Sequence, residues 1–257
     1  MSLATPPDPT AQSVARDLER LRYAVYGAAA LLAGIWLVWF GGWRLGWAND
    51  ALGILPRDPA HLVGILSAPL VHASFEHLMA NTLPLGLLGL LVLYAYPLAA
   101  RRALPAIWLG AGLGVWLFGR ASVHVGISGI THGLMFFLFL TGLLRRDRLG
   151  VVIALVVFFF YGGMLMTVLP REEHVSFEYH LAGAVCGVLA ALRWHGLDPL
   201  PPRKHYSWEY EDDAEPDSET ELPRPDEVPV LWQRPAEDVR GRVIEFRPRP
   251  PQDGGSA

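Results

Sequence analysis

Apolar and polar stretches alternate along the chain in a pattern that predicts membrane-spanning helices. Roughly 20 apolar residues cross the hydrocarbon core of a bilayer, and runs as short as ~17 can do so. Six apolar runs with few charges lie at about Leu21–Phe40, Leu78–Tyr96, Leu104–Phe118, Ile127–Leu144, Val151–Leu169 and Phe177–Trp194. The pattern therefore predicts an all-α polytopic membrane protein, a bundle of six transmembrane helices.

The polar segments divide the chain into three expected parts. These are an N-terminal segment over residues 1–21, a membrane domain over residues 22–196 and a tail over residues 197–257. The tail gathers acids over Glu209–Glu221 and is rich in proline beyond them, and such charged, poorly apolar sequence favours disorder. Gly41–Leu70 is too long for a hairpin turn, so we expect a long outer loop with short helices at the membrane interface.

Composition agrees with a membrane protein and excludes an ordinary soluble domain. Apolar residues make up 52% of the chain, and the mean hydropathy is +0.28. The net charge of −4 says little about partners, because the acids concentrate in the tail, and no nucleic-acid partner is expected. The single cysteine, Cys186, excludes an intrachain disulfide.

Arginine placement predicts the orientation, because the cytoplasmic flanks of membrane helices retain positive charge. Alternate connections, counted from the N-terminus, carry Arg16, Arg20, Arg22, Arg101, Arg102, Arg145, Arg146, Arg148, Arg193, Arg203 and Lys204. The opposite connections carry only Arg44, Arg57, Arg120 and Arg171. We therefore expect both termini to be cytoplasmic. Without an organelle-targeting lead, the bacterial plasma (inner) membrane is the expected location.

Three polar residues from three runs fall at one expected membrane depth. At ~1.5 Å rise per residue, Ser128 lies roughly 25 Å above Arg145. By the same rule, His180 lies roughly 20 Å above Arg193, and Asn81 roughly 23 Å above Tyr96. All three then occupy the outer third of a core about 30 Å thick. Polar groups at such depth are costly and usually face a protein interior, so they predict a functional site.

Glycine spacing suggests how Ser128 and His180 could meet. Glycines recur four residues apart on the fourth and sixth runs, as Gly129 and Gly133, and as Gly183 and Gly187. Such faces let helices pack closely, and His180 shares the face of Gly183. A serine at a helix start can also be an N-cap or interhelical glue. The shared depth instead favours a Ser–His dyad, in which His180 accepts the proton of Ser128 and the alkoxide attacks a carbonyl.

His77 and Asn81 lie four residues apart and so share one face of the second span. An asparagine amide donates hydrogen bonds without carrying charge, which suits stabilisation of a developing oxyanion. The backbone N–H of Ser128 could supply another donor. Each residue alone has a structural explanation, as an interfacial histidine or as interhelical glue.

The combination resembles the rhomboid family of intramembrane serine proteases. The matching motifs are His77-x-x-x-Asn81, Gly126-x-Ser128-Gly129 and His180-x-x-Gly183-x-x-x-Gly187, within about Ala68–Trp194. The resemblance implies a six-helix fold, Ser128 as nucleophile, His180 as general base, and His77, Asn81 and the Ser128 amide as the oxyanion hole. It also implies cleavage of single-span transmembrane substrates near the outer membrane face, without a cofactor. His72 matches a further family position.

One position departs from the family pattern. Four residues after the serine, where the family usually has an aromatic ring packed on the catalytic histidine, this chain has His132. It could stack as an imidazole or compete for the proton of the nucleophile, and we expect stacking. The acids nearest the expected site are Glu76 and, in the expected outer loop, Glu172, Glu173 and Glu178. None is expected to orient His180, so we predict a catalytic unit of two residues.

Two other function classes are compatible with a membrane bundle of this kind. A non-proteolytic rhomboid-like protein would bind membrane clients, but such relatives lack the dyad that is present here. A metal-dependent enzyme or transporter could use histidine ligands. The candidates are His72, His77, His124, His132, His174 and His180. No His-Glu-x-x-His motif occurs, and no metal site is predicted.

Overall fold

The computed structural model describes residues 9–46, 49–170 and 175–200. The predicted disorder of the tail beyond residue 200 lies outside the described residues. Helices are α1 (Ala11–Leu45), α2 (Gly64–Ser67), α3 (Phe75–Ala95), α4 (Pro97–Phe118), α5 (Ser128–Arg145), α6 (Arg148–Tyr161) and α7 (Phe177–Trp194). Short 3-10 segments are η1 (Asn49–Leu52), η2 (Pro59–His61), η3 (Ala68–Leu70) and η4 (Gly162–Val168). The described chain is therefore all-helical, and its only extended pairing is an isolated bridge between Ile54 and His124.

Five of the six apolar runs lie largely within one long helix each, and the run Val151–Leu169 is divided between α6 and η4. Four helical segments are long and apolar enough to cross a membrane: α1, α3, α5, and α6 continued by η4. The α4 and α7 helices have similar lengths, but Arg101 and Arg102 in α4 and Glu178, His180 and Arg193 in α7 make them more polar. The all-helical fold is confirmed, whereas the count of six spans stays a prediction.

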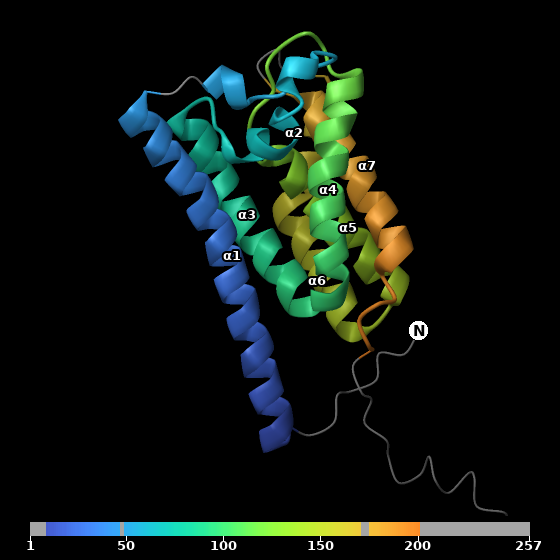
Figure 1. The fold of residues 1–257 in the computed structure, drawn as a ribbon. Coiled ribbons are helices and arrows are strands. Elements are labelled where there is room, and N and C mark those ends of the chain that lie inside the picture. The colour runs from blue at the N-terminus through green and yellow to red at the C-terminus, as the bar shows by residue number, and fades with distance from the viewer. Residues whose placement is uncertain (1–8, 47–48, 171–174, 201–257) are drawn as a thin grey trace, which may run out of the picture. The chain divides into compact units, whose positions relative to one another are not determined.

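The helices form a bundle whose turns alternate between two ends (Figure 1). The α3–α4 and α5–α6 turns lie at one end, and the long connection that contains α2 lies at the other. α5 packs against α3, α4, α6 and α7, whereas α1 packs chiefly against α3. Apolar side chains fill the interior, including Leu85, Ile107, Leu134 and Phe137. The helix α5, which Ser128 opens, is therefore the centre of the bundle.

The end opposite the α2 connection is held by a buried polar cluster. The Asp198 carboxylate accepts hydrogen bonds from the backbone N–H groups of Leu98 (2.9 Å) and Ala99 (3.0 Å), and it thereby caps α4 from outside the helix. The guanidinium of Arg145 donates to the carbonyl of Asp198 (2.7 Å) and pairs with Asp147 (2.8 Å). The first residues of the expected tail thus pack onto the helical bundle.

Replacing Asp198 with alanine should destabilise the bundle, because it leaves two N–H groups of α4 without their acceptor. By analogy with N-cap deletions, we expect the free energy of unfolding to fall by about 1–2 kcal/mol. Thermal unfolding in detergent measures the change. Asp17→Ala, at an exposed position of α1, is the matched control. An unchanged melting temperature for Asp198→Ala would show that the cap is dispensable.

Candidate active site

The predicted site residues lie at helix starts. Ser128 is the first residue of α5, His180 lies in the first turn of α7, and His77 lies in the first turn of α3. Two of these starts are capped by serine: Ser74 accepts from the His77 N–H (3.1 Å), and Ser176 accepts from the N–H of Tyr179 (3.3 Å). Capping therefore fixes where α3 and α7 begin, whereas the start of α5 has no side-chain cap.

The α5 and α7 backbones touch along the predicted glycine faces. A Cβ atom on Gly183 would collide with the carbonyl of Gly129, and one on Gly187 would collide with the carbonyl of Gly133. No side chain fits between the helices at these points. We call these two contacts the glycine seam. Ser128 directly precedes Gly129, and His180 lies one turn before Gly183, so the seam places both residues in the same part of the bundle.

His132 connects the helix of Ser128 to the ring of His180. The two imidazole rings stack with centroids 3.9 Å apart and planes 12° apart, the arrangement expected from the position of His132. Nδ1 of His132 donates to the carbonyl oxygen of Ser128 (2.6 Å). In the described part of the chain no hydrogen bond joins Ser128 Oγ to His180, a contact that often tightens only when substrate binds.

The tautomer of His180 follows from its one ring contact with the backbone. Nδ1 lies 3.0 Å from the carbonyl oxygen of Thr167, and a carbonyl can only accept. In the neutral ring Nδ1 therefore carries the proton and Nε2 carries the lone pair. An imidazole in this form is poised to accept a proton at Nε2. The Thr167 carbonyl holds the ring as a carboxylate does in a catalytic triad.

Thr167 was not among the residues predicted from the sequence. It lies in η4, and its hydroxyl is also 2.8 Å from Nε2 of His132. Its backbone contact with His180 has no sequence signature. The sequence does carry a signal for the hydroxyl, because Thr167 is the only serine or threonine in the run Val151–Leu169 and lies near its C-terminal end.

His77 packs against the turn that leads into Ser128. Gly126 has φ of +108°, a conformation that favours glycine, and a Cβ atom there would lie 2.5 Å from Cε1 of His77. Asn81 is buried and donates from Nδ2 to the carbonyl of His77 (3.0 Å), which leaves its second amide hydrogen available. The His72 ring is buried against His77, with centroids 5.1 Å apart. His77 thus lies against the turn before the serine, and Asn81 lies one helical turn further along α3.

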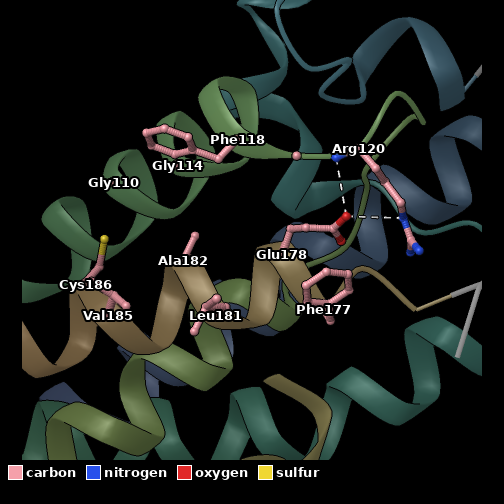
Figure 2. Close-up of a pocket in the computed structure, with 11 residues that line it drawn as sticks. Gly110, Gly114, Phe118, Arg120, Phe177, Glu178, Leu181, Ala182, Val185 and Cys186 are labelled. Atoms are coloured by element: carbon pink, nitrogen blue, oxygen red, sulfur yellow. Dashed lines mark hydrogen bonds and ion pairs between the residues drawn. The ribbon is translucent and has the colours of Figure 1, made fainter. Parts of the chain in front are cut away.

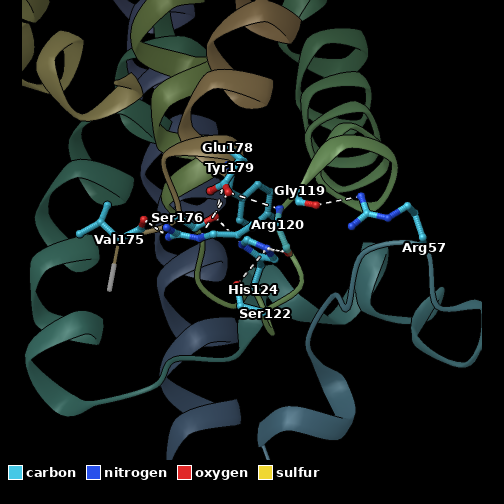
Figure 3. Close-up of polar contacts among 9 residues, drawn as sticks. All are labelled: Arg57, Gly119, Arg120, Ser122, His124, Val175, Ser176, Glu178 and Tyr179. Atoms are coloured by element: carbon cyan, nitrogen blue, oxygen red, sulfur yellow. Dashed lines mark hydrogen bonds and ion pairs between the residues drawn. The ribbon is translucent and has the colours of Figure 1, made fainter. Parts of the chain in front are cut away.

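The loop before Ser128 is fastened to the start of α7 (Figure 3). Arg120 donates to the carbonyl of Val175 (2.6 Å) and pairs with the Glu178 carboxylate (3.3 Å). Nε2 of His124 donates to the Arg120 carbonyl (3.1 Å), which leaves Nδ1 to accept from the Ser176 hydroxyl (2.6 Å). Burial lowers the pKa of His124, in agreement with this neutral ring. These contacts couple the α5 start to the α7 start.

The long connection between α1 and α3 contributes a second attachment. Ile54 and His124 exchange two backbone hydrogen bonds of 2.9 Å each. The guanidinium of Arg57 donates to the carbonyl of Gly119 (2.9 Å), as Figure 3 shows. His124 is therefore engaged in holding the loop. Among the described residues, no three His, Cys, Asp or Glu side chains gather in a group able to hold a metal ion, and His174 lies outside these residues.

A pocket of about 650 Å³ lies between α4 and α7 (Figure 2). Its walls are mainly apolar, and Arg120 and Glu178 stand at one end. Gly110 and Gly114 face Cys186 and Ala182 across the helix contact. Ser128 and His180 do not line this pocket, so it does not define the candidate active site.

The long apolar helices describe an integral membrane protein. The chain belongs to the rhomboid family, because the Rhomboid domain matches residues 59–196.

Uncharacterized proteins of Mycobacterium tuberculosis and Mycobacterium bovis are each 40% identical to the chain over 210 residues. The match covers 77% of this chain and 84% of each relative. An uncharacterized protein of Mycobacterium leprae is 37% identical over 165 residues, covering 61% of this chain and 63% of the relative.

Proposed function

We propose that this protein is an intramembrane serine endopeptidase that cleaves single-span transmembrane proteins near the outer membrane face. Ser128 is the nucleophile and His180 is the general base. The observation that carries the proposal is the linkage of the two residues through His132, which stacks on the His180 ring and bonds to the Ser128 carbonyl. The tautomer of His180, with a lone pair on Nε2, suits the same role.

The proposed reaction is peptide hydrolysis in two steps. Nε2 of His180 takes the hydroxyl proton as Ser128 Oγ attacks the scissile carbonyl, and the proton then passes to the departing amine. This leaves an acyl ester on Ser128. A water molecule, deprotonated by His180, attacks the ester and releases the new carboxyl end with the serine restored. No metal or cofactor is required.

The oxyanion of each tetrahedral intermediate would be stabilised by His77, Asn81 and the Ser128 backbone N–H. What supports this assignment is the packing of His77 on Gly126 and the burial of Asn81 beneath it. The second amide hydrogen of Asn81 and the N–H of the first residue of α5 are uncharged hydrogen-bond donors. His72 would support the orientation of the His77 ring.

The proposed topology has six spans with both termini cytoplasmic, in a bacterial plasma membrane. α4 and α7 then complete the set of membrane-crossing helices, and the polar starts of α5 and α7 face outward. The bundle architecture in Figure 1, with alternating turns, supports this count. The arginine-rich connections supply the cytoplasmic end, and the mycobacterial relatives agree with a bacterial membrane.

Cleavage of a synthetic substrate tests the function. The full chain, purified and placed in liposomes, is mixed with a single-span protein that carries small residues near the outer end of its span. We expect two fragments, produced equally in the presence of EDTA and lost in Ser128→Ala. Stable binding without fragments would support the client-binding alternative, and inhibition by EDTA would support the metal-dependent one.

A further inference from the structure

We propose that Thr167 is a positioning residue that holds His132 and His180 in one rigid unit beside the nucleophile. This inference rests on the proposed proteolytic function. Thr167 meets both rings, one through its hydroxyl and the other through its carbonyl. It lies on η4, whereas the rings belong to α5 and α7, so three segments converge on one residue.

The hydroxyl contact follows from the protonation of His132. Because Nδ1 of His132 donates to the Ser128 carbonyl, Nε2 of the neutral ring must accept. The Thr167 hydroxyl is placed to donate either to the carbonyl of Met164 (2.9 Å) or to this nitrogen (2.8 Å), and in the proposed unit its single proton goes to Nε2 of His132. His132 is thus fixed at both ring nitrogens.

Among the described residues no carboxylate bonds to the His180 ring, and the carbonyl contact takes that place. The carboxylate closest to His180 in sequence is Glu178, and its Oε1 pairs with Arg120. His180 instead donates from Nδ1 to the Thr167 carbonyl (3.0 Å). A backbone acceptor carries no charge, so the ring depends on accurate placement of that carbonyl rather than on long-range attraction.

The stacked rings join the two contacts into one unit. Stacking at 3.9 Å means that a tilt of His132 displaces His180, and the reverse. The Thr167 hydroxyl therefore orients the general base indirectly, by fixing His132, and its carbonyl orients it directly. Loss of the hydroxyl should loosen both imidazole rings. The rate of cleavage should then fall, because a small displacement of a catalytic group can greatly reduce the rate.

Isosteric variants of the full chain test the proposal. Thr167→Val keeps the shape and the β-branch but removes the hydroxyl, whereas Thr167→Ser keeps the hydroxyl. His132→Phe keeps a stacking ring but removes both nitrogens. We expect Thr167→Val and His132→Phe each to lower kcat for the single-span substrate roughly 10-fold with KM unchanged, and Thr167→Ser to keep most of the rate. The double variant should be no slower than the slower single variant, because both changes break one linkage.

Thermal unfolding of each variant separates positioning from structure. Equal melting temperatures with a reduced kcat support positioning. A Thr167→Val variant with wild-type kcat, equal losses in Thr167→Val and Thr167→Ser, or multiplicative losses in the double variant would overturn it. If the wild type cleaves and Ser128→Ala does not, these outcomes refute only the role of Thr167. A wild type that does not cleave would refute the proposed function itself.

Discussion

The Ser128→Ala variant is expected to lose cleavage of the single-span substrate by roughly 10³-fold or more, because it removes the attacking oxygen. His180→Ala should cause a loss of similar size, because His180 is the proposed base that takes the serine proton. The two losses should not multiply in the double variant, because nucleophile and base act in one step. Fragment formation over time, in liposomes, measures all three rates.

Matched controls keep this result interpretable. Ser122→Ala removes an exposed serine in the link before α5 and should retain activity. His61→Ala removes a half-buried histidine that pairs with Asp58 in the outer loop, and it should also retain activity. Thermal unfolding should be unchanged in all these variants. Residual cleavage by Ser128→Ala at more than a small fraction of the wild-type rate would refute the assignment of the nucleophile.

The Gly183→Ala variant is expected to lose both stability and activity. Its added Cβ would overlap the carbonyl of Gly129. The carbonyl is part of the α5 backbone and the Cβ is fixed directly to the α7 backbone, so neither can rotate away. Overpacking of this kind costs about 1–3 kcal/mol. Separation of α5 from α7 would also move Ser128 relative to His180. We therefore expect a lower melting temperature together with at least a roughly 10-fold slower cleavage.

Gly163→Ala is the matched control for this glycine. It lies in η4, and a Cβ atom there would meet no neighbouring atom. We expect it to behave as wild type in both measurements. A Gly183→Ala variant that unfolds and cleaves as wild type would show that the glycine seam does not set the spacing of the two helices.

Sequence periodicity predicted the helices well because membrane spans need length and apolarity, which are visible in one dimension. The run Phe177–Trp194 coincides with α7 residue for residue. The short helices of the outer loop were also expected, although their bounds were not. The helix α1 begins at Ala11, whereas the apolar run within it begins at Leu21. The charged residues before Leu21 belong to the same helix.

The candidate site could be predicted in part for a similar reason. Ser128, His180 and Asn81 are polar residues in apolar surroundings, and the glycines around them recur at helical spacing. The stacking of His132 followed from its position one turn after Ser128. These features are side-chain identities at fixed intervals, which a sequence records directly.

Contacts through the backbone could not be predicted. The acceptor for His180 is the carbonyl of Thr167, an atom that every residue has, so no residue type marks it. Asp198 caps a helix a hundred residues away, and its sequence gives no hint of that partner. His124 was weighed as a metal ligand, yet its partners are Ser176 and the Arg120 carbonyl. Long-range polar contacts require the fold before they can be found.

The assignment of Ser128 as the nucleophile is tested most directly by finding which residue reacts with a serine-directed probe. The full chain is labelled with a fluorophosphonate, digested and analysed by mass spectrometry. We predict a single phosphonyl adduct on Ser128, with labelling slowed in His180→Ala and absent in Ser128→Ala. An adduct on another residue, or undiminished labelling of Ser128→Ala, would contradict the claim that Ser128 is the nucleophile of an intramembrane protease.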